Sequence, residues 1–257
     1  MTNLLKAIYT IWLREILRFV KSKSRLVGSI AQPFIWLAIV GVGLNAAFKM
    51  TNNISYLSFM AIGIMGMTIL FNSLFAGINV IWDRQFGFLK EILVAPISRI
   101  GIVLGKIFGS TTISVIMALI VLIIVLLFGI ISIKSITFLG IITAIIFMIL
   151  TSVTFVGMGL IIATNVDNIE GFQVLMNFLV MPLFFLSGAL FPITSSTPEW
   201  LQIVSKIDPL FYAIDGIRGS LTKISVYPVQ FDLLIVFIVA VVLVLIADIM
   251  FRKIEGK

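Results

Sequence analysis

The sequence has 257 residues, of which 61% are hydrophobic and 11% are charged, and its mean hydropathy is +1.23. An ordinary soluble domain is roughly 45–50% apolar and about 25% charged, so this composition excludes a soluble globular enzyme. The formal net charge is +7, and the chain lacks cysteine and histidine, which excludes disulfides, thiolate nucleophiles and the usual zinc ligands.

Residues 1–25 predict an amphipathic helix that lies in the cytoplasmic membrane interface. Polar side chains recur every three to four residues on one side of this helix, and apolar side chains occupy the other. The polar side holds Lys6, Thr10, Arg14, Arg18 and Lys21, and the apolar side holds Leu4, Ile8, Ile11, Trp12, Ile16 and Phe19. The same pattern fits a membrane anchor alone and an anchor that also contacts a partner protein.

Six apolar runs fill most of residues 26–257, and each is long enough to cross a bilayer as a helix. Pro33 predicts a kink in the first run, and Gly63, Gly66 and Gly77 in the second predict close helix packing. The expected spans cover residues 26–48, 56–81, 107–128, 138–164, 172–190 and 233–250. The sequence therefore predicts an all-α, polytopic membrane domain over residues 26–257.

Residues 191–230, between the last two spans, predict short helices that re-enter the outer membrane surface. The string Thr197-Pro198-Glu199 has the cap residue, first-turn proline and early acid of a helix start. Asp208-Pro209 repeats this signal, and Asp215 and Arg218 are spaced to pair on the helix that follows.

Lys and Arg are distributed unequally between the two sides of the membrane. Thirteen of the 18 lie before the first span, between the second and third, or after the last. The other side holds Lys49, Lys134, Lys206, Arg218 and Lys223. The positive-inside rule predicts that both termini are cytoplasmic, and anionic lipid, not nucleic acid, is the expected partner of the basic residues.

Residues 83–99 interrupt the apolar pattern and predict a short cytoplasmic helix between two spans. Phe86, Leu89 and Leu93 recur at helical spacing, and Pro96 ends the pattern. Charge comes from Arg84, Lys90 and Glu91. On pattern alone, a helix that only lies in the membrane interface remains an alternative.

Two short strings resemble nucleotide-binding motifs and are interpreted as coincidences. Residues 101–106 (GIVLGK) lack the spacing of a phosphate loop and are followed by Ile107, not by Ser or Thr. Residues 186–188 (LSG) lie at the outer end of a span. The chain is therefore expected to have no nucleotide, metal or catalytic site of its own.

At this point the chain resembles the permease subunits of type 2 ABC exporters, a family that includes daunorubicin-resistance-like and nodulation-type export proteins. The resemblance covers nearly the whole chain, and three ordered stretches carry it. They are residues 88–99 (FLKEILVAPISR) with 104–106 (LGK), residues 182–192 (PLFFLSGALFP) and residues 208–218 (DPLFYAIDGIR).

The resemblance implies a half-channel that pairs with a second copy of itself or a homologous permease. It also implies two separate ATPase subunits that bind ATP and Mg on the cytoplasmic side. Residues 83–99 would be the coupling helix, residues 4–20 within the interfacial segment 1–25 the connecting helix, and the outer helices a cap over the path. The residues expected to couple to the ATPase are Asp83, Arg84, Gln85, Phe86, Phe88, Lys90 and Glu91.

The expected function is ATP-driven export of a hydrophobic or amphipathic compound, such as a drug, lipid or natural product, across a prokaryotic-type plasma membrane. The polar residues expected along the path are Asn72, Ser73, Asn79, Asn177 and Ser187, although helix packing would use the same residue types. The alternatives are a polysaccharide or glycolipid exporter permease, which the lack of an aromatic ladder disfavours, and a non-transporting membrane partner of an ATPase. An ion-coupled carrier is disfavoured, because the spans offer little beyond Asp248 as a buried ionisable group.

Overall fold

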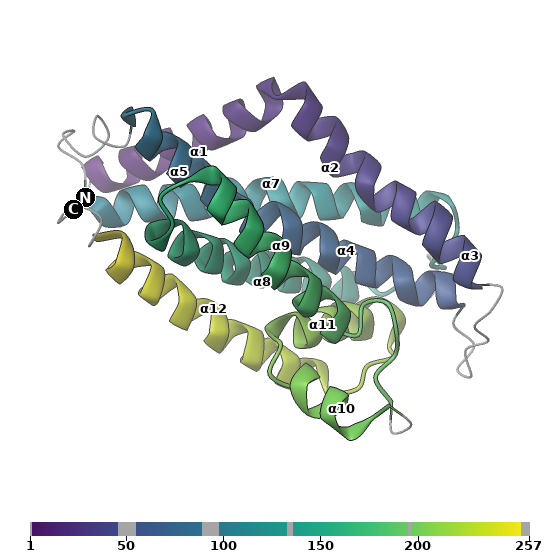
Figure 1. Ribbon diagram of the computed structural model, residues 1–257. Coiled ribbons are helices and arrows are strands. Elements are labelled where there is room, and N and C mark those ends of the chain that lie inside the picture. Colours follow the sequence, from purple (N-terminus) through teal and green to yellow (C-terminus); the bar gives the residue numbers. More distant parts are fainter. Residues whose placement is uncertain (1, 46–54, 89–97, 133–135, 195–196, 253–257) are drawn as a thin grey trace.

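The computed structural model describes residues 2–45, 55–88, 98–132, 136–194 and 197–252, and all regular elements in these ranges are helical. Six of the helical stretches are long and apolar enough to cross a membrane, which confirms the predicted all-α polytopic fold. In Figure 1 the start of α1, the end of α5, the start of α7 and the end of α12 share one end of the bundle, and α3 and α10 lie at the other. The elements are α1 (Thr2–Lys21), α2 (Lys23–Ile35), the π-helix η1 (Trp36–Gly41), α3 (Val42–Asn45), α4 (Tyr56–Leu74), α5 (Ala76–Gln85), α7 (Arg99–Leu127), α8 (Phe138–Asn165), α9 (Ile169–Leu186), α10 (Glu199–Ser205), α11 (Pro209–Thr222) and α12 (Val229–Arg252).

The amphipathic helix α1 packs along α7, and a row of small residues on α7 lets the two helices approach closely. Its buried stripe contacts three glycines of α7 that are spaced four residues apart, Gly101, Gly105 and Gly109. Glycines at this spacing lie on one face of a helix and let another backbone approach closely. These contacts give the GIVLGK string a packing role within a helix. The buried stripe of α1 consists of Ala7, Ile11, Glu15 and Phe19.

Pro33 affects the first span as expected, and the structure specifies how. Because proline has no backbone N–H, the regular ladder is interrupted one turn earlier, and the chain widens into the π-helical turn η1 directly after α2. Trp36 at the start of η1 makes an edge-to-face contact with Phe184 of α9, with ring centroids 6.0 Å apart. The first and fifth spans are thus in contact near the middle of the bundle.

Helix α4 is the centre of the bundle and packs against α7, α8 and α11. Ser73 near its end bonds to Ser114 of α7 at 3.0 Å and to Ser152 of α8 at 2.8 Å. All three hydroxyls are buried, so they join the three central helices. Gly63 and Gly66 of α4 contact Ala189 and the side chain of Ile214, which confirms the close packing predicted for this span.

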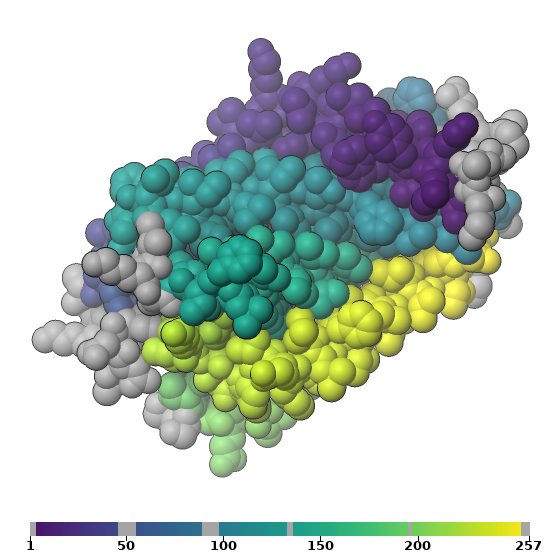
Figure 2. Space-filling view, turned by 180° about the vertical axis from the view of Figure 1, so that it is seen from behind, coloured from purple at the N-terminus to yellow at the C-terminus, as the bar shows by residue number. Residues whose placement is uncertain are grey.

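The second span bends at Phe75, where α4 ends and α5 begins. Just beyond the bend, Gly77 of α5 and Gly159 of α8 come into backbone contact: a Cβ at Gly77 would collide with the Gly159 carbonyl oxygen. This crossing sets the course of α5 toward the inner end. Figure 2 shows the opposite face of the molecule, where α1 lies across α7 and α12 lies along α8.

Several helix boundaries differ from the expected spans; for example, the second span continues to Gln85 and α12 begins at Val229. Helix α7 begins at Arg99, two turns before the predicted third span, because Ser98 caps it through the Gly101 N–H at 3.3 Å and because α1 packs on its first turns. Helix α9 ends at Leu186, before the predicted residue 190, and the turn that follows places Gly188 at a φ of +69°. Glycine adopts this left-handed conformation without steric strain.

The outer segment contains two helices that pack below α9 in Figure 1. Asp208 caps α11 through the Leu210 N–H at 2.8 Å with Pro209 in the first turn, as predicted. For α10 the expected cap was wrong by one residue: Pro198 occupies the cap position, and the Thr197 hydroxyl accepts from the Thr194 N–H instead. Burial raises the pKa of Asp208 to about 8, so the protonated form predominates at neutral pH.

Arg218 links α11 to α4 and to the turn that follows α9. It donates to the Gly188 carbonyl at 3.1 Å, and its guanidinium lies 3.8 Å from the Phe59 ring centroid. The predicted pair with Asp215 is present at 3.9 Å, although Asp215 mainly accepts from the Val226 and Tyr227 N–H groups. Burial lowers the pKa of Arg218 to about 10, and Asp215 offsets part of this effect, so Arg218 stays cationic at neutral pH.

Candidate functional site

Asp83 is the centre of a buried charge cluster where α1, α5 and α7 meet, at the end of the bundle that the sequence predicts to be cytoplasmic. Its side chain is 1% exposed, and one carboxylate oxygen lies 2.6 Å from Lys106 Nζ of α7. The other oxygen pairs with Arg14 at 2.8 Å and with Arg18 at 3.2 Å, both from α1. A carboxylate with three cationic partners connects the three helices through charge-assisted hydrogen bonds.

A second carboxylate, Glu15 of α1, completes this cluster. One of its oxygens lies 3.5 Å from Lys106 Nζ, and the other accepts from the Asn79 amide at 2.8 Å. Asn79 in turn accepts from Arg25 of α2 at 3.4 Å. The chain of contacts therefore connects the interfacial helix, the end of the second span, the start of the third span and the start of the first. We call this set the inner charge cluster; its members are Arg14, Glu15, Arg18, Arg25, Asn79, Asp83 and Lys106.

The sequence patterns did not single out Glu15 or Lys106 as members of a site. A signal for Glu15 was present, because it lies one turn from both Ile11 and Phe19 on the apolar side of α1. An acid in such a stripe is rarely buried without a cationic partner. The partner itself, Lys106, could not be identified, because it is 91 residues away along the chain.

In the described part of the expected coupling segment, Arg84 and Gln85 are held by contacts with the residues after α8, and two aromatic side chains that follow are exposed. Arg84 hydrogen-bonds the Val166 carbonyl and lies 3.6 Å from the Asp167 carboxylate, and Gln85 donates to the Asp167 carbonyl at 3.4 Å. Phe86 and Phe88 are exposed. The Arg14 guanidinium lies 5.9 Å from the Phe88 ring centroid, which joins this segment to the inner charge cluster. Lys90 and Glu91 lie outside the described residues.

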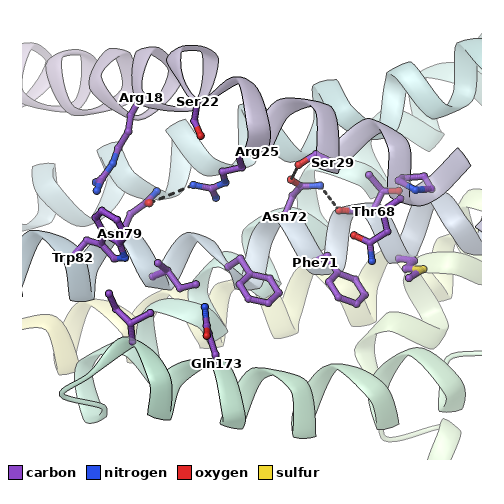
Figure 3. Close-up of a pocket in the computed structure, with 17 residues that line it drawn as sticks. Arg18, Ser22, Arg25, Ser29, Thr68, Phe71, Asn72, Asn79, Trp82 and Gln173 are labelled. Atoms are coloured by element: carbon purple, nitrogen blue, oxygen red, sulfur yellow. Dashed lines mark hydrogen bonds between the residues drawn. The ribbon is translucent and has the colours of Figure 1, made fainter. Parts of the chain in front are cut away.

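A cleft of about 550 Å³ opens beside the inner charge cluster, between α2, the α4–α5 pair and α9. Figure 3 shows Arg18 and Arg25 pointing into it from α1 and α2, and Gln173 facing them from α9. Asn72 donates to the Thr68 carbonyl at 2.9 Å and accepts from Ser29 at 3.1 Å across the cleft wall. The volume falls within the range of about 300–1,000 Å³ that is usual for small-molecule sites.

The structure brings two of the expected path residues, Asn72 and Asn79, together in this cleft. The other three lie elsewhere. Ser73 belongs to the buried serine contacts of α4, α7 and α8, and the Ser187 hydroxyl is buried and donates to the Phe184 carbonyl at 2.7 Å. Asn177 is exposed on α9 and does not line the cleft.

A family model for the ABC-2 type transporter matches residues 6–222, which is most of the chain. The chain belongs to the ABC-2 type transporter family. The family inferred from the three sequence stretches is therefore confirmed, and the chain is a multi-pass transmembrane subunit of a transporter.

Individual relatives agree with this assignment. The inner membrane transport permease YadH of Escherichia coli K12 is 26% identical over 93% of this chain and 92% of its own length. A protein assigned as the transport permease ycf38 of Cyanophora paradoxa is 34% identical over 78% of this chain and 70% of its own length. Nodulation protein J of Rhizobium leguminosarum bv. viciae is 23% identical over 82% of this chain and 80% of its own length.

The string that resembled a phosphate loop in this ABC-2 permease lies inside α7. Gly101, Gly105 and Lys106 are all helical, and the Lys106 ammonium bonds to Asp83 and Glu15. A phosphate loop instead needs backbone N–H groups free in a turn between a strand and a helix. Among the described residues, no group of three or more acidic side chains is placed to hold a metal ion.

Proposed function

We propose that this permease is the membrane half of an ATP-driven exporter that moves a hydrophobic or amphipathic compound out of the cytoplasm. It pairs with a second copy of itself or a homologous permease. Two separate ATPase subunits bind ATP and Mg and carry out the hydrolysis. The observation that carries the proposal is the cleft of this ABC-2 chain. It has the volume of a small-molecule site, and its lining reaches Asn79 and Trp82 of α5, next to the expected coupling segment.

The composition of the cleft supports an amphipathic cargo. Met67, Phe71, Phe75 and Ile78 contribute apolar surface, whereas Arg18, Arg25 and Asn79 lie together at one end. Sites that take small molecules are mostly apolar with a few convergent polar groups. A compound with an apolar body and a polar end matches this division.

The inner charge cluster supports a coupling role for residues 83–99. Phe86 and Phe88 form the contact surface offered to an ATPase, and Asp83, which is buried, acts through Arg14, Arg18 and Lys106 instead of touching the partner. A displacement of the segment by ATP binding would pull directly on α1 and α7. The start of α2, which forms one wall of the cleft, is connected to the same cluster by Arg25 and Asn79.

The proposed orientation has both termini in the cytoplasm, and cysteine labelling tests it on a chain that has no native cysteine. Lys23 at the start of α2 and Glu199 at the start of α10 are both exposed. In intact cells, Glu199→Cys is expected to react with a membrane-impermeant maleimide and Lys23→Cys only after permeabilisation. The reverse pattern would overturn the orientation.

Reconstitution tests the export function itself. The purified permease is expected to hydrolyse no ATP alone, and to support ATP-dependent efflux from vesicles once a separate ATPase is bound. In the same experiment Phe88→Ala is expected to weaken ATPase binding by about 2 kcal/mol, the typical cost of removing an aromatic hot spot. Phe128→Ala, a matched exposed aromatic at the outer end, serves as the control. Hydrolysis by the permease alone would exclude the two-component proposal, and normal ATPase binding by Phe88→Ala would exclude this coupling surface.

A further inference from the structure

The wall of the cleft carries an excess of positive charge. The inner charge cluster contains four cations, Arg14, Arg18, Arg25 and Lys106, and two carboxylates, Glu15 and Asp83. The described residues that line the cleft include Arg18 and Arg25 but no Asp or Glu. Two positive charges are therefore not balanced within the cluster, at the edge of an apolar space where unbalanced charge is costly.

Arg25 is the cation with the least satisfied environment. The hydrogen bond found for it within the described residues is to the neutral Asn79 amide oxygen at 3.4 Å, and its guanidinium also lies 5.5 Å from the Phe19 ring centroid. The contacts found for Glu15 among the described residues are with Lys106, Asn79 and the α7 glycine beside it, and none is a direct ion pair with Arg25. A guanidinium has five N–H donors in a fork that matches phosphate and carboxylate, so most of its bonding capacity faces the cleft.

Beyond these two arginines, the described lining carries no charge and combines apolar side chains with the neutral polar Ser29, Thr68 and Asn72. Met67, Phe71 and Phe75 line this part, and Figure 3 shows Phe71 on the side of the cleft away from Arg18. The two charged groups of the lining therefore lie at one end of the cleft, as the charged headgroup lies at one end of a lipid.

We propose that the cleft binds an amphiphile with an anionic phosphate or carboxylate headgroup, which pairs with Arg25 and Arg18 while its apolar part lies along Met67, Phe71 and Phe75. This inference rests on the proposed function only for the identity of the amphiphile as cargo, since binding belongs to the permease itself. The same chemistry fits a resident anionic lipid of the inner leaflet, and the experiment separates the two sources.

Binding is measured on the purified permease in neutral detergent by quenching of Trp82, which lines the cleft, with brominated phosphatidic acid and with brominated phosphatidylcholine of equal chain length. Phosphatidic acid is expected to quench saturably at about tenfold lower concentration, as one charge-assisted pairing would give. Arg25→Gln is expected to remove this preference, Arg25→Lys to retain part of it, and Lys23→Gln, an exposed cation outside the cleft, to leave it unchanged. Trp82→Phe identifies the share of quenching that comes from the cleft, and melting temperatures verify that each variant is folded.

Equal affinity for the two lipids, or an unchanged preference in Arg25→Gln, would overturn the inference. The second arm uses the permease with its ATPase in liposomes and follows a fluorescent phosphatidic acid analogue placed in the leaflet on the ATPase side. ATP-dependent loss of the analogue from that leaflet identifies the anionic amphiphile as cargo. If phosphatidic acid binds preferentially but the analogue stays in its leaflet, the cleft binds a resident anionic lipid. This outcome supports the anionic site and contradicts the proposed export of such a compound. Failure of the site and failure of the export function therefore give different results.

Discussion

Asp83→Asn is expected to lower the free energy of unfolding by about 3–5 kcal/mol, the usual cost of removing one partner of a buried ion pair. The side chain is 1% exposed, and its loss leaves Arg14, Arg18 and Lys106 with Glu15 as the sole carboxylate of the inner charge cluster. The measurement is unfolding of the purified protein in detergent, followed by tryptophan fluorescence and by the monodisperse fraction after heating.

A double-mutant cycle makes this prediction specific to the cluster. Lys106 Nζ lies 2.6 Å from the Asp83 carboxylate, so Lys106→Met should partly restore the stability lost in Asp83→Asn. Additive losses in the double variant would show that the two side chains do not act as a pair. The control is Asp248→Asn, which breaks a half-exposed i, i+4 pair with Arg252 at 2.6 Å and should cost only about 0–1 kcal/mol.

Gly77→Ala is expected to lower the free energy of unfolding by about 1–3 kcal/mol, because an added Cβ overpacks a contact between two backbones. The Cβ would collide with the Gly159 carbonyl oxygen and with the Phe172 ring, and a carbonyl held in a helix cannot rotate away. The bend at Phe75 would have to open to relieve the collision. That movement would displace Asp83 and the coupling segment, so ATPase binding should fall together with stability.

A second substitution at the same crossing and a control substitution elsewhere test this explanation. Gly159→Ala approaches the same crossing from α8, where its Cβ would meet the Leu74 carbonyl, and it should cause a similar loss. Gly43→Ala is the control, since no atom lies within 4 Å of the position and alanine favours a helix. If Gly77→Ala were as stable as Gly43→Ala, the close crossing of α5 and α8 would be excluded.

The amino-acid sequence by itself determined the membrane fold and the six spans. Apolar runs of bilayer length must form helices that satisfy their own backbone groups, so hydropathy and length are sufficient. Pro33, Asp208-Pro209 and the glycines of the second span were also informative, because capping, kinking and close packing depend on a few neighbouring residues. The family could be inferred for a similar reason, since three short stretches kept their order and spacing.

Only the tertiary structure decided which polar residues belong together. Asn72, Ser73 and Asn79 look alike in sequence. In the fold, Ser73 of α4 points into the centre of the bundle, whereas Asn72 of α4 and Asn79 of α5 line the cleft. Asp83 looked like a surface charge of the coupling segment, and it is buried because α1 folds back along α7 and brings Arg14 to within 2.8 Å of it. Such pairings depend on helix rotation and on contacts between residues 64–91 positions apart, and local patterns carry no information about them.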